Sequence, residues 1–430
     1  MEYYSRTADN LLSLLLDAFG AVLIEGPKWC GKTTTAEQFA NSVIKMQDPD
    51  MEEEYLVTAE TKPSLLLQGP TPRLIDEWQD VPALWDAVRT MVDKRSLPGQ
   101  FILTGSNSVK RDQIKHSGTG RIVKMSMLPM SLWESRESSG EISLSDLFNN
   151  PDYDIDGKPS AMTVEELIFA ACRGGWPASL RGNTDSAKLM IAKSYIKSLC
   201  SEDIQRIDSV DRSEKLARQI LRSYARNIST TVKKSQILAD VTSSGSVSCS
   251  SSTLDDYLSA LERLFVIQDI DAWNPSIRSK SAIRSSPKRS FCDPSIAVAS
   301  LGLTPEELQM QLKTFGFIFE QMIIRDLKAY TIGLDSHVSY YRDRYGLEAD
   351  VVLHIGNGKY ALIECKLGSR EIEEGAQHLV ELRDLIREYN RREQQVPIKE
   401  PELMIVITGG RMAYTREDGV KVIPLASLKP

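Results

Sequence analysis

The sequence lacks the features that mark disulfide-bonded, zinc-binding or membrane-spanning proteins. Its six cysteines lie far apart, no two form a C-x-x-C pair, and the chain has only four histidines. This excludes a disulfide framework and a zinc-finger type of site, and is typical of a protein with reduced thiols. No apolar run approaches the ~18 residues that a membrane-spanning helix needs, and the first residues do not form a signal peptide. We therefore expect a soluble, cytoplasmic protein with no membrane partner.

The chain also lacks an excess of basic charge. Its 430 residues are 41% hydrophobic and 26% charged, and the net charge is −7. This is an ordinary globular composition, and the length predicts about two to four domains. Because the protein as a whole would repel a polyanion, any contact with nucleic acid must come from a local basic patch.

Changes of pattern along the chain predict an α/β protein with three parts. From Ala21 to Met127, amphipathic segments separate the short apolar runs AVLIE, SVIKM, RLIDE, QFILT and RIVKM. Such runs predict a parallel sheet covered by helices on both faces. A polar stretch at residues 134–160 indicates a linker or excursion. We expect an N-terminal domain with this parallel sheet (1–160), a helical middle segment (161–310) and a C-terminal α/β domain (311–430).

The strongest motif lies at the end of the first apolar run. Residues 26–33, GPKWCGKT, match G-x-x-x-x-G-K-[ST] at every fixed position, after the strand AVLIE and before a helix-forming run. Glycines let the backbone wrap phosphate oxygens, Lys32 is expected to reach the β- and γ-phosphates, and Thr33 is expected to bind Mg²⁺. The predicted ATP-binding residues are Gly26, Pro27, Lys28, Trp29, Cys30, Gly31, Lys32, Thr33 and Thr34.

A second motif, RLIDE, ends an apolar strand in two acids. Asp76 is predicted to hold Mg²⁺ with Thr33, and Glu77 to orient and polarise the attacking water.

A third strand runs into Thr104, and Ser106 follows closely. Either hydroxyl is a candidate for sensing the γ-phosphate, and a simple turn is the alternative. Arg121 is a candidate for contacting phosphate in cis or from a neighbouring subunit, or for bracing a strand.

The middle segment has the order of helices that a winged helix requires. Three helical runs, at 216–228, 235–241 and 251–264, precede the candidate wing strands FVIQDIDAW and RSFCD. The third run repeats leucine at helical spacing through Leu254, Leu258 and Leu261. A loop with basic residues and no acid joins the wing strands, so it is a candidate contact for DNA backbone or for a protein partner. The basic residues are Arg278, Lys280, Arg284, Lys288 and Arg289.

The C-terminal part carries the pattern D…E-x-K across a predicted hairpin. Asp350 lies on one strand, and Glu364 and Lys366 lie on one face of the next. Two carboxylates and a lysine can hold a divalent metal and activate water, as in restriction-endonuclease-like enzymes. Glu320 and Gln377 occupy positions expected for accessory polar groups. Cleavage, binding without cleavage and a surface salt bridge all remain open at this site.

Four segments together resemble a prokaryotic family of AAA-type ATPases with a C-terminal domain of unknown function. They are GAVLIEGPKWCGKTTTAEQFA, LIDEWQDVPALWDAVR, QFILTGS and RGGWP (Arg173 to Pro177). The resemblance covers nearly the whole chain. It implies an AAA-like core, a middle winged helix and a nuclease-like C-terminal fold, with ATP and Mg²⁺ as ligands.

Three functions follow as hypotheses. The first is an ATPase whose hydrolysis resets the middle and C-terminal parts. The second is an ATP-regulated, metal-dependent nuclease. The third is a regulator or scaffold that binds ATP without turning it over. The oligomeric state is left open by the sequence.

Overall fold

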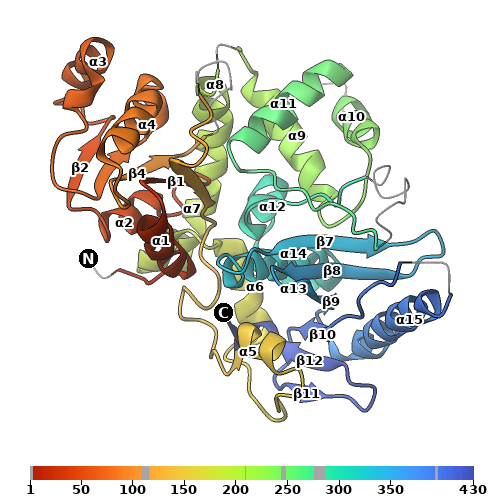
Figure 1. Cartoon of the computed structure of the whole chain (residues 1–430). Helices are drawn as coiled ribbons and strands as arrows, with labels where there is room; N and C mark the ends of the chain where they lie inside the picture. The colour runs from red at the N-terminus through yellow and green to blue at the C-terminus, as the bar shows by residue number, and fades with distance from the viewer. Residues whose placement is uncertain (1–2, 108–115, 209, 244–247, 276–285, 393–395) are drawn as a thin grey trace.

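The computed structural model describes residues 3–107, 116–208, 210–243, 248–275, 286–392 and 396–430. The chain has an α/β fold with one sheet in its N-terminal part and another in its C-terminal part, joined through a helical region (Figure 1). Over these residues, no helix combines the length and the apolar character needed to cross a membrane.

The N-terminal part is built on five parallel strands in the order β2-β3-β4-β1-β5, which are the five apolar runs predicted from the sequence. The strands are β1 (Ala21–Glu25), β2 (Ser42–Lys45), β3 (Arg73–Asp76), β4 (Phe101–Gly105) and β5 (Ile122–Ser126). The helices are α1 (Thr7–Ala18), α2 (Lys32–Glu37), α3 (Glu52–Thr61) and α4 (Ala83–Arg95), with short 3₁₀ turns η1 (Pro63–Leu65) and η2 (Trp78–Asp80). Strand β1 lies between β4 and β5 and is buried along its whole length. Because the strands are parallel, the carboxyl ends of β1, β3 and β4 share one edge, where open α/β sheets bind ligands.

The middle part is helical. Its elements are α6 (Val164–Arg173), η4 (Pro177–Arg181), α7 (Asp185–Ser198), the π-helix η5 (Leu199–Asp203), α8 (Ile204–Arg206), α9 (Glu214–Arg226), α10 (Lys234–Ser243), α11 (Ser251–Arg263), α12 (Pro294–Leu301) and α13 (Pro305–Met310). Helices α9, α10 and α11 coincide with the three predicted helical runs. Two antiparallel bridges, Ile267 to Phe291 and Ile270 to Lys288, follow them. The winged-helix assignment itself stays a prediction.

The C-terminal part is a six-stranded sheet, ordered β11-β12-β10-β9-β8-β7, between two long helices. The strands are β7 (His337–Arg342), β8 (Glu348–Ile355), β9 (Lys359–Lys366), β10 (Leu403–Thr408), β11 (Tyr414–Thr415) and β12 (Lys421–Pro424). Helix α14 (Leu312–Tyr330) packs on one face, and α15 (Ile372–Asn390), preceded by η7 (Ser369–Glu371), packs on the other. Alternate residues of β8, β9 and β10 therefore enter two separate cores.

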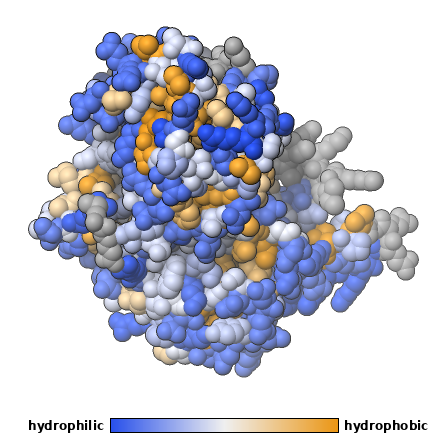
Figure 2. All heavy atoms as spheres, turned by 60° about the vertical axis from the view of Figure 1, so that its left-hand side comes forward, coloured by the Kyte–Doolittle hydropathy of each residue, from blue (hydrophilic) through white to orange (hydrophobic). Residues whose placement is uncertain are grey.

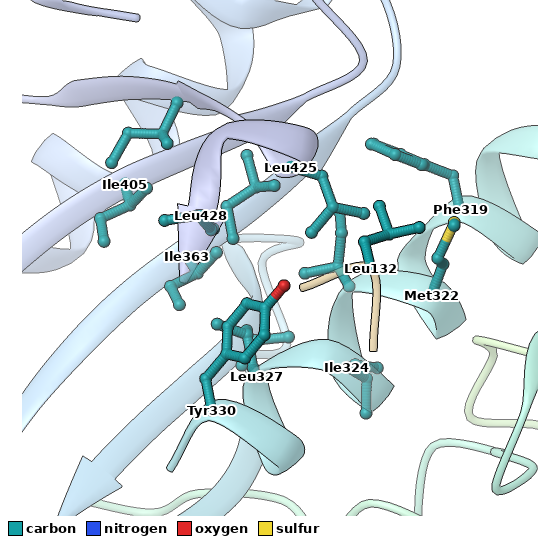
Figure 3. Packing of buried hydrophobic residues seen from close by; sticks show 14 of the residues in the cluster. Leu132, Phe319, Met322, Ile324, Leu327, Tyr330, Ile363, Ile405, Leu425 and Leu428 are labelled. Carbon is teal, nitrogen blue, oxygen red and sulfur yellow. The ribbon is translucent and has the colours of Figure 1, made fainter. Parts of the chain in front are cut away.

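The stretch 134–160 is not the linker that its polar composition suggests. It contains β6 (Ile142–Ser143) and α5 (Leu144–Asn149), and β6 pairs in parallel with β13 (Leu428–Lys429), which follows η8 (Leu425–Ser427). Phe148 and Ile155 are 1% and 0% exposed and belong to the same core as α14. Leu132, just before the stretch, lies among Phe319, Leu425 and Leu428 in that core (Figure 3). Most residues of this stretch are polar, but apolar residues such as Phe148 and Ile155 are buried in the core.

The face turned forward in Figure 2 is mainly hydrophilic, with groups of hydrophobic side chains between the polar ones. In the N-terminal part, the exposed large apolar residues include Leu14, Trp29 and Val57. Trp29 is 46% exposed although it lies inside the GPKWCGKT loop. An apolar ring is therefore presented at the edge of the predicted nucleotide site.

Candidate functional site

The loop between β1 and α2 has the backbone shape that the motif requires. Gly31 has φ 104° and Trp29 has φ 64°, so the chain turns sharply before α2 begins at Lys32. At Gly26, an added Cβ would lie 2.1 Å from the carbonyl oxygen of Met127, so only glycine fits there. The loop thus wraps closely between the end of β1 and the first turn of α2, as a phosphate cradle must.

Lys32 is directed into this loop. Its Nζ donates to the carbonyl oxygens of Gly26 and Pro27, each at 3.0 Å, and the residue is only 4% exposed. The ammonium group is therefore buried within the cradle and lies beside the loop backbone that would surround the phosphates.

Asp76 connects the P-loop helix to β3 and β4. Its Oδ1 accepts hydrogen bonds from the hydroxyl of Thr33 and from the hydroxyl of Thr104, each at 2.6 Å. The backbone N–H of Glu77 in turn donates to Oγ1 of Thr104 at 3.1 Å. The structure thus brings together three residues from three elements that the sequence separates by up to 71 positions, between Thr33 and Thr104.

Glu77 is held in an unusual backbone conformation. Its φ is 55°, in the left-handed region, where the chain passes from β3 into η2. Its Oε2 accepts from Oγ of Ser106 at 2.9 Å and also from Nε2 of Gln79. Trp78 is 2% exposed and packs on Trp85 with ring centroids 4.9 Å apart. Gln79 and Trp78 therefore have structural roles that the motif alone does not reveal.

The oxygen atoms around Asp76 suit a magnesium ion. Mg²⁺ prefers carboxylate and hydroxyl oxygens together with phosphate oxygens and water. Thr33 and Asp76 offer one hydroxyl and one carboxylate in contact, beside the cradle that Lys32 enters. These donors fit the ligand set of an ATP-bound Mg²⁺ in P-loop proteins.

Arg121 does not belong to this site in cis. It precedes β5, and its carbonyl oxygen accepts from the N–H of Ala21, the first residue of β1. The P-loop follows the last residue of β1, so Arg121 lies at the opposite edge of the sheet. Its Nε donates to Asp93 at 2.8 Å on the surface, which corrects the expectation of a phosphate contact within the chain. A role in a neighbouring subunit stays a prediction.

Two residues that the sequence analysis missed brace the P-loop from behind. Arg6 donates through Nη1 to the carbonyl oxygen of Cys30 at 2.8 Å and through Nε to Glu134 at 2.9 Å. Glu134 is 4% exposed. Burial disfavours the charge of Glu134, but the Arg6 guanidinium and backbone N–H groups outweigh it and lower the pKa of the carboxyl. Arg6 and Glu134 are 128 residues apart, so no local pattern indicates their pairing.

The middle part also contacts the P-loop directly. Nζ of Lys28 lies 2.5 Å from Oδ1 of Asp203, the last residue of the π-helix η5. The ring of Trp29 meets Tyr195 of α7 edge-on at 5.6 Å, and Tyr195 stacks on the buried Trp176 at 4.4 Å. Single π-turns in helices are frequent at functional sites. One ion pair and one aromatic contact therefore join the nucleotide loop to the helical part.

The segment RGGWP fixes the chain where it passes behind the P-loop. Arg173 forms a bidentate ion pair with Glu137, in which Nη1 donates to Oε1 at 2.9 Å and Nη2 donates to Oε2 at 2.8 Å. A Cβ on Gly175 would lie 2.2 Å from the carbonyl oxygen of Met130, whose N–H donates to Gly175 O at 2.6 Å. This motif therefore packs the middle part on the segment that leaves β5.

The C-terminal residues of the D…E-x-K pattern do meet. Pairing of Val351 with Ile363 sets Asp350 beside Glu364, and Oδ2 of Asp350 accepts from the N–H of Cys365 at 2.9 Å. Glu364 is fully buried and lies 2.8 Å from Nζ of Lys366, so the pair is not a surface salt bridge. Burial, with the nearby Asp350 carboxylate, raises the pKa of Glu364 to about 7.

The two accessory positions differ in outcome. Glu320 on α14 is 7% exposed and lies in the cluster, as expected. Gln377 does not, because it donates to Glu381 on the exposed face of α15. The neighbouring His378 faces the cluster instead, with Nδ1 3.8 Å from Glu364. One position along a helix changes the face by about 100°, which explains the error.

Two residues assigned to a basic wing are interior residues. Lys288 and Arg289 are 6% and 4% exposed. Arg289 donates to Asp269 at 2.6 Å and twice to the carbonyl oxygen of Val232. Both are therefore neutralised inside the protein, which corrects the expectation that they contact phosphate. Arg278, Lys280 and Arg284 lie outside the described residues.

Lys288 instead belongs to the C-terminal cluster. Its Nζ lies 2.7 Å from Oε1 of Glu320, 3.0 Å from the carbonyl oxygen of Asp350 and 3.5 Å from Oδ1 of Asp350. Burial disfavours its charge, but the carboxylates of Glu320 and Asp350 outweigh burial and raise its pKa. Within the described part of the chain, no group of three or more His, Cys, Asp or Glu residues is arranged to hold a metal ion. In this cluster, the cation beside the carboxylates of Glu320 and Asp350 is the ammonium of Lys288.

Comparison with known proteins gives three adjacent matches along the chain. Residues 18–135 match a family model described as AAA domain, and residues 164–307 and 315–428 match two described as domain of unknown function, DUF8612 and DUF4143. The N-terminal part is thus an AAA-type P-loop domain.

Two relatives match over most of the chain. The chain is 24% identical over 366 residues, 83% of its length and 72% of theirs, to uncharacterized protein Rv2008c of Mycobacterium tuberculosis and uncharacterized protein Mb2031c of Mycobacterium bovis. Among solved structures, the Walker-type ATPase PABY2304 of Pyrococcus abyssi matches with 14% identity and a TM-score of 0.42, over 69% of this chain and 96% of that one.

Proposed function

We propose that the protein binds ATP with Mg²⁺ and hydrolyses it. The observation that carries this proposal is the junction at Asp76, where the hydroxyls of Thr33 and Thr104 meet one carboxylate oxygen at 2.6 Å. Glu77, the next residue, has a left-handed backbone conformation, and its carboxylate accepts a hydrogen bond from Ser106. A binding loop alone needs the cradle, whereas hydrolysis also needs a residue that positions the attacking water near the γ-phosphate.

Each residue then has a role that its contacts support. Lys32 exchanges its two carbonyl partners for β- and γ-phosphate oxygens, while the loop N–H groups surround the β-phosphate. Thr33 and Asp76 would hold Mg²⁺, which neutralises charge that develops on the phosphate oxygens. Glu77 orients the attacking water and accepts its proton, and Thr104 keeps Asp76 and the backbone of Glu77 in register.

The first test is the loss of nucleotide affinity in Lys32→Ala. We expect ATP binding, measured by calorimetry with Mg²⁺, to weaken by at least about 10-fold, and phosphate release to fall to background, because a buried charge-assisted contact is lost. Lys94→Ala, at an exposed position of α4, is the matched control and should bind and turn over ATP like the wild type.

The outcomes separate the hypotheses. Wild-type protein that binds ATP tightly with negligible phosphate release would favour a non-hydrolysing regulator. Equal phosphate release by the wild type and Lys32→Ala would contradict the ATPase proposal.

We further propose that ATP binding resets the middle and C-terminal parts, which present a winged helix and a nuclease-like sheet to a nucleic-acid or protein partner. The contacts of Lys28 with Asp203 and of Trp29 with Tyr195 support this coupling, because they join the loop that must adjust around phosphate to α7 and η5. An oligomeric assembly is compatible with this proposal.

The coupling is testable at the ion pair. We expect Asp203→Asn to raise the Kd for ATP about 5-fold, because the loop loses a partner that pre-organises it, a change of about 1 kcal/mol. In a Lys28→Met background, the same substitution should have little further effect, since the pair is already broken.

Asp185→Asn is the control, because Asp185 begins α7, the helix that precedes η5, and pairs with Lys188 on the surface. Strictly additive effects of Lys28→Met and Asp203→Asn on the Kd would show that the pair does not act on the nucleotide loop.

A further inference from the structure

The C-terminal cluster contains a cation that belongs to the chain itself. The ammonium of Lys288 contacts Glu320 of α14 at 2.7 Å and both a main-chain and a side-chain oxygen of Asp350 in β8. Mg²⁺ bound by the same carboxylates would stand about 2.0–2.1 Å from their oxygens, and a charge-assisted N–H···O contact is about 2.7–2.9 Å long, so both cations would lie between the same oxygens. One position between these two acids cannot hold both cations.

Lys288 is fixed in this place by the backbone and by its neighbours. Its N–H and carbonyl oxygen both bond to Ile270, at 2.8 and 2.9 Å, in an antiparallel bridge. The ring of Tyr340 in β7 lies 5.5 Å from its Nζ, and the Tyr340 hydroxyl donates to the carbonyl oxygen of Ser286 at 2.6 Å. The lysine comes from the middle part, whereas its acidic partners belong to the C-terminal part.

We propose that Lys288 occupies the position of the divalent metal in the C-terminal D…E-x-K cluster, so that the cluster takes up no Mg²⁺ or Mn²⁺ while this ammonium is in place. The cluster is then a lysine-closed acidic site rather than a working metal centre. Its carboxylates, Asp350 and Glu320 with Glu364 beside them, become available to a divalent cation only when Lys288 is removed or withdrawn. This proposal does not depend on ATP hydrolysis at the P-loop.

The test is calorimetric titration of the nucleotide-free chain with Mn²⁺. We expect the wild type and Asp350→Asn to bind Mn²⁺ equally weakly. The comparison with Asp350→Asn separates binding at this cluster from weak binding elsewhere on the chain. Lys288→Met removes the ammonium and keeps much of its volume. It should bind about one Mn²⁺ per chain at least about 10-fold more tightly than the wild type, and Asp350→Asn should abolish the gain. Lys288→Arg keeps a positive charge in the cluster and should stay closed to the metal.

Two results would overturn the proposal. One is wild-type protein that binds Mn²⁺ through Asp350 as tightly as Lys288→Met, because the metal would then displace the lysine freely. The other is folded Lys288→Met that gains no Asp350-dependent binding. Should Lys288→Met fail to fold because Glu320 is left buried without a partner, Lys288→Met/Glu320→Gln removes both charges. That variant should still gain Mn²⁺ binding through Asp350 and Glu364, and its failure to do so while folded counts equally against the proposal.

Discussion

Replacement of Glu77 by glutamine is expected to leave ATP bound and to slow its hydrolysis by about 100-fold or more. Glutamine keeps the size of the side chain and can still bond to Ser106, which now holds Glu77 at 2.9 Å. It cannot accept a proton from water, so the loss should fall on turnover rather than on affinity. The Kd for ATP should change less than about 3-fold, since Lys32 and the loop backbone are untouched.

The measurement is single-turnover phosphate release beside equilibrium binding of ATP. Glu53→Gln, at an exposed position in the first turn of α3, is the matched control. A Glu77→Gln protein with wild-type turnover would remove Glu77 from the chemistry and direct attention to Ser106 or Thr104. If affinity falls together with turnover, Glu77 instead has a structural role, which its positive φ makes a meaningful alternative.

The largest effect on stability is expected at Arg325, in α14. This residue is 3% exposed and pairs with two fully buried carboxylates, Asp326 at 2.7 Å and Asp293 at 3.1 Å. Arg325→Met would leave both acids without their cation, so we expect the free energy of unfolding to fall by about 3–5 kcal/mol. Urea unfolding, followed separately by fluorescence and by circular dichroism because the chain has several parts, would measure it.

The deficit of this variant should depend on pH. Burial raises the pKa of Asp326 to about 6 even beside Arg325. An acid with a raised pKa in the folded state stabilises the fold at low pH and loses that contribution as pH rises through the folded pKa. Arg325 lowers this pKa, so its removal should raise the folded pKa of Asp326 further. The deficit of Arg325→Met relative to the wild type should therefore be smallest near pH 5, where Asp326 is mostly protonated in both folded proteins, and largest near pH 8.

Two further variants check this explanation. Arg392→Met, at a side chain that is 63% exposed, should be neutral. Arg325→Met/Asp293→Asn/Asp326→Asn should recover part of the loss, because neutral amides replace the stranded charges. A deficit that is constant from pH 5 to pH 8 would contradict the charge-based account.

The parts of the site that sequence could predict are those encoded by neighbouring residues. The loop from Gly26 to Thr33 and the acids at Asp76 and Glu77 each follow an apolar strand, and parallel strands bring their carboxyl ends to one edge. Helix α11 could also be predicted from the sequence, since Leu254, Leu258 and Leu261 repeat at helical spacing. All three are buried in the structure. Its cap is Ser250, whose side chain accepts from the N–H of Thr253.

The parts that sequence could not predict depend on partners far away in the chain. Nothing near Arg6 indicates Glu134, and nothing near Lys28 indicates Asp203, 175 residues later. Lys288 and Arg289 look like solvated loop residues by composition. Their burial follows from acids on other elements, Glu320 and Asp269, that neutralise them. Charge in a sequence therefore predicts a surface only when no distant counter-charge is folded against it.

The short segment after β5 contacts both the P-loop region and the C-terminal core. Leu132 sits in the C-terminal core and its N–H donates to Asp326, while Glu134, two residues on, holds Arg6 against the P-loop carbonyl of Cys30. The residue that packs in the C-terminal core is therefore only two positions along the chain from the residue that holds Arg6 at the P-loop. The P-loop and the C-terminal part are thus connected through this short segment, although they lie far apart in the sequence.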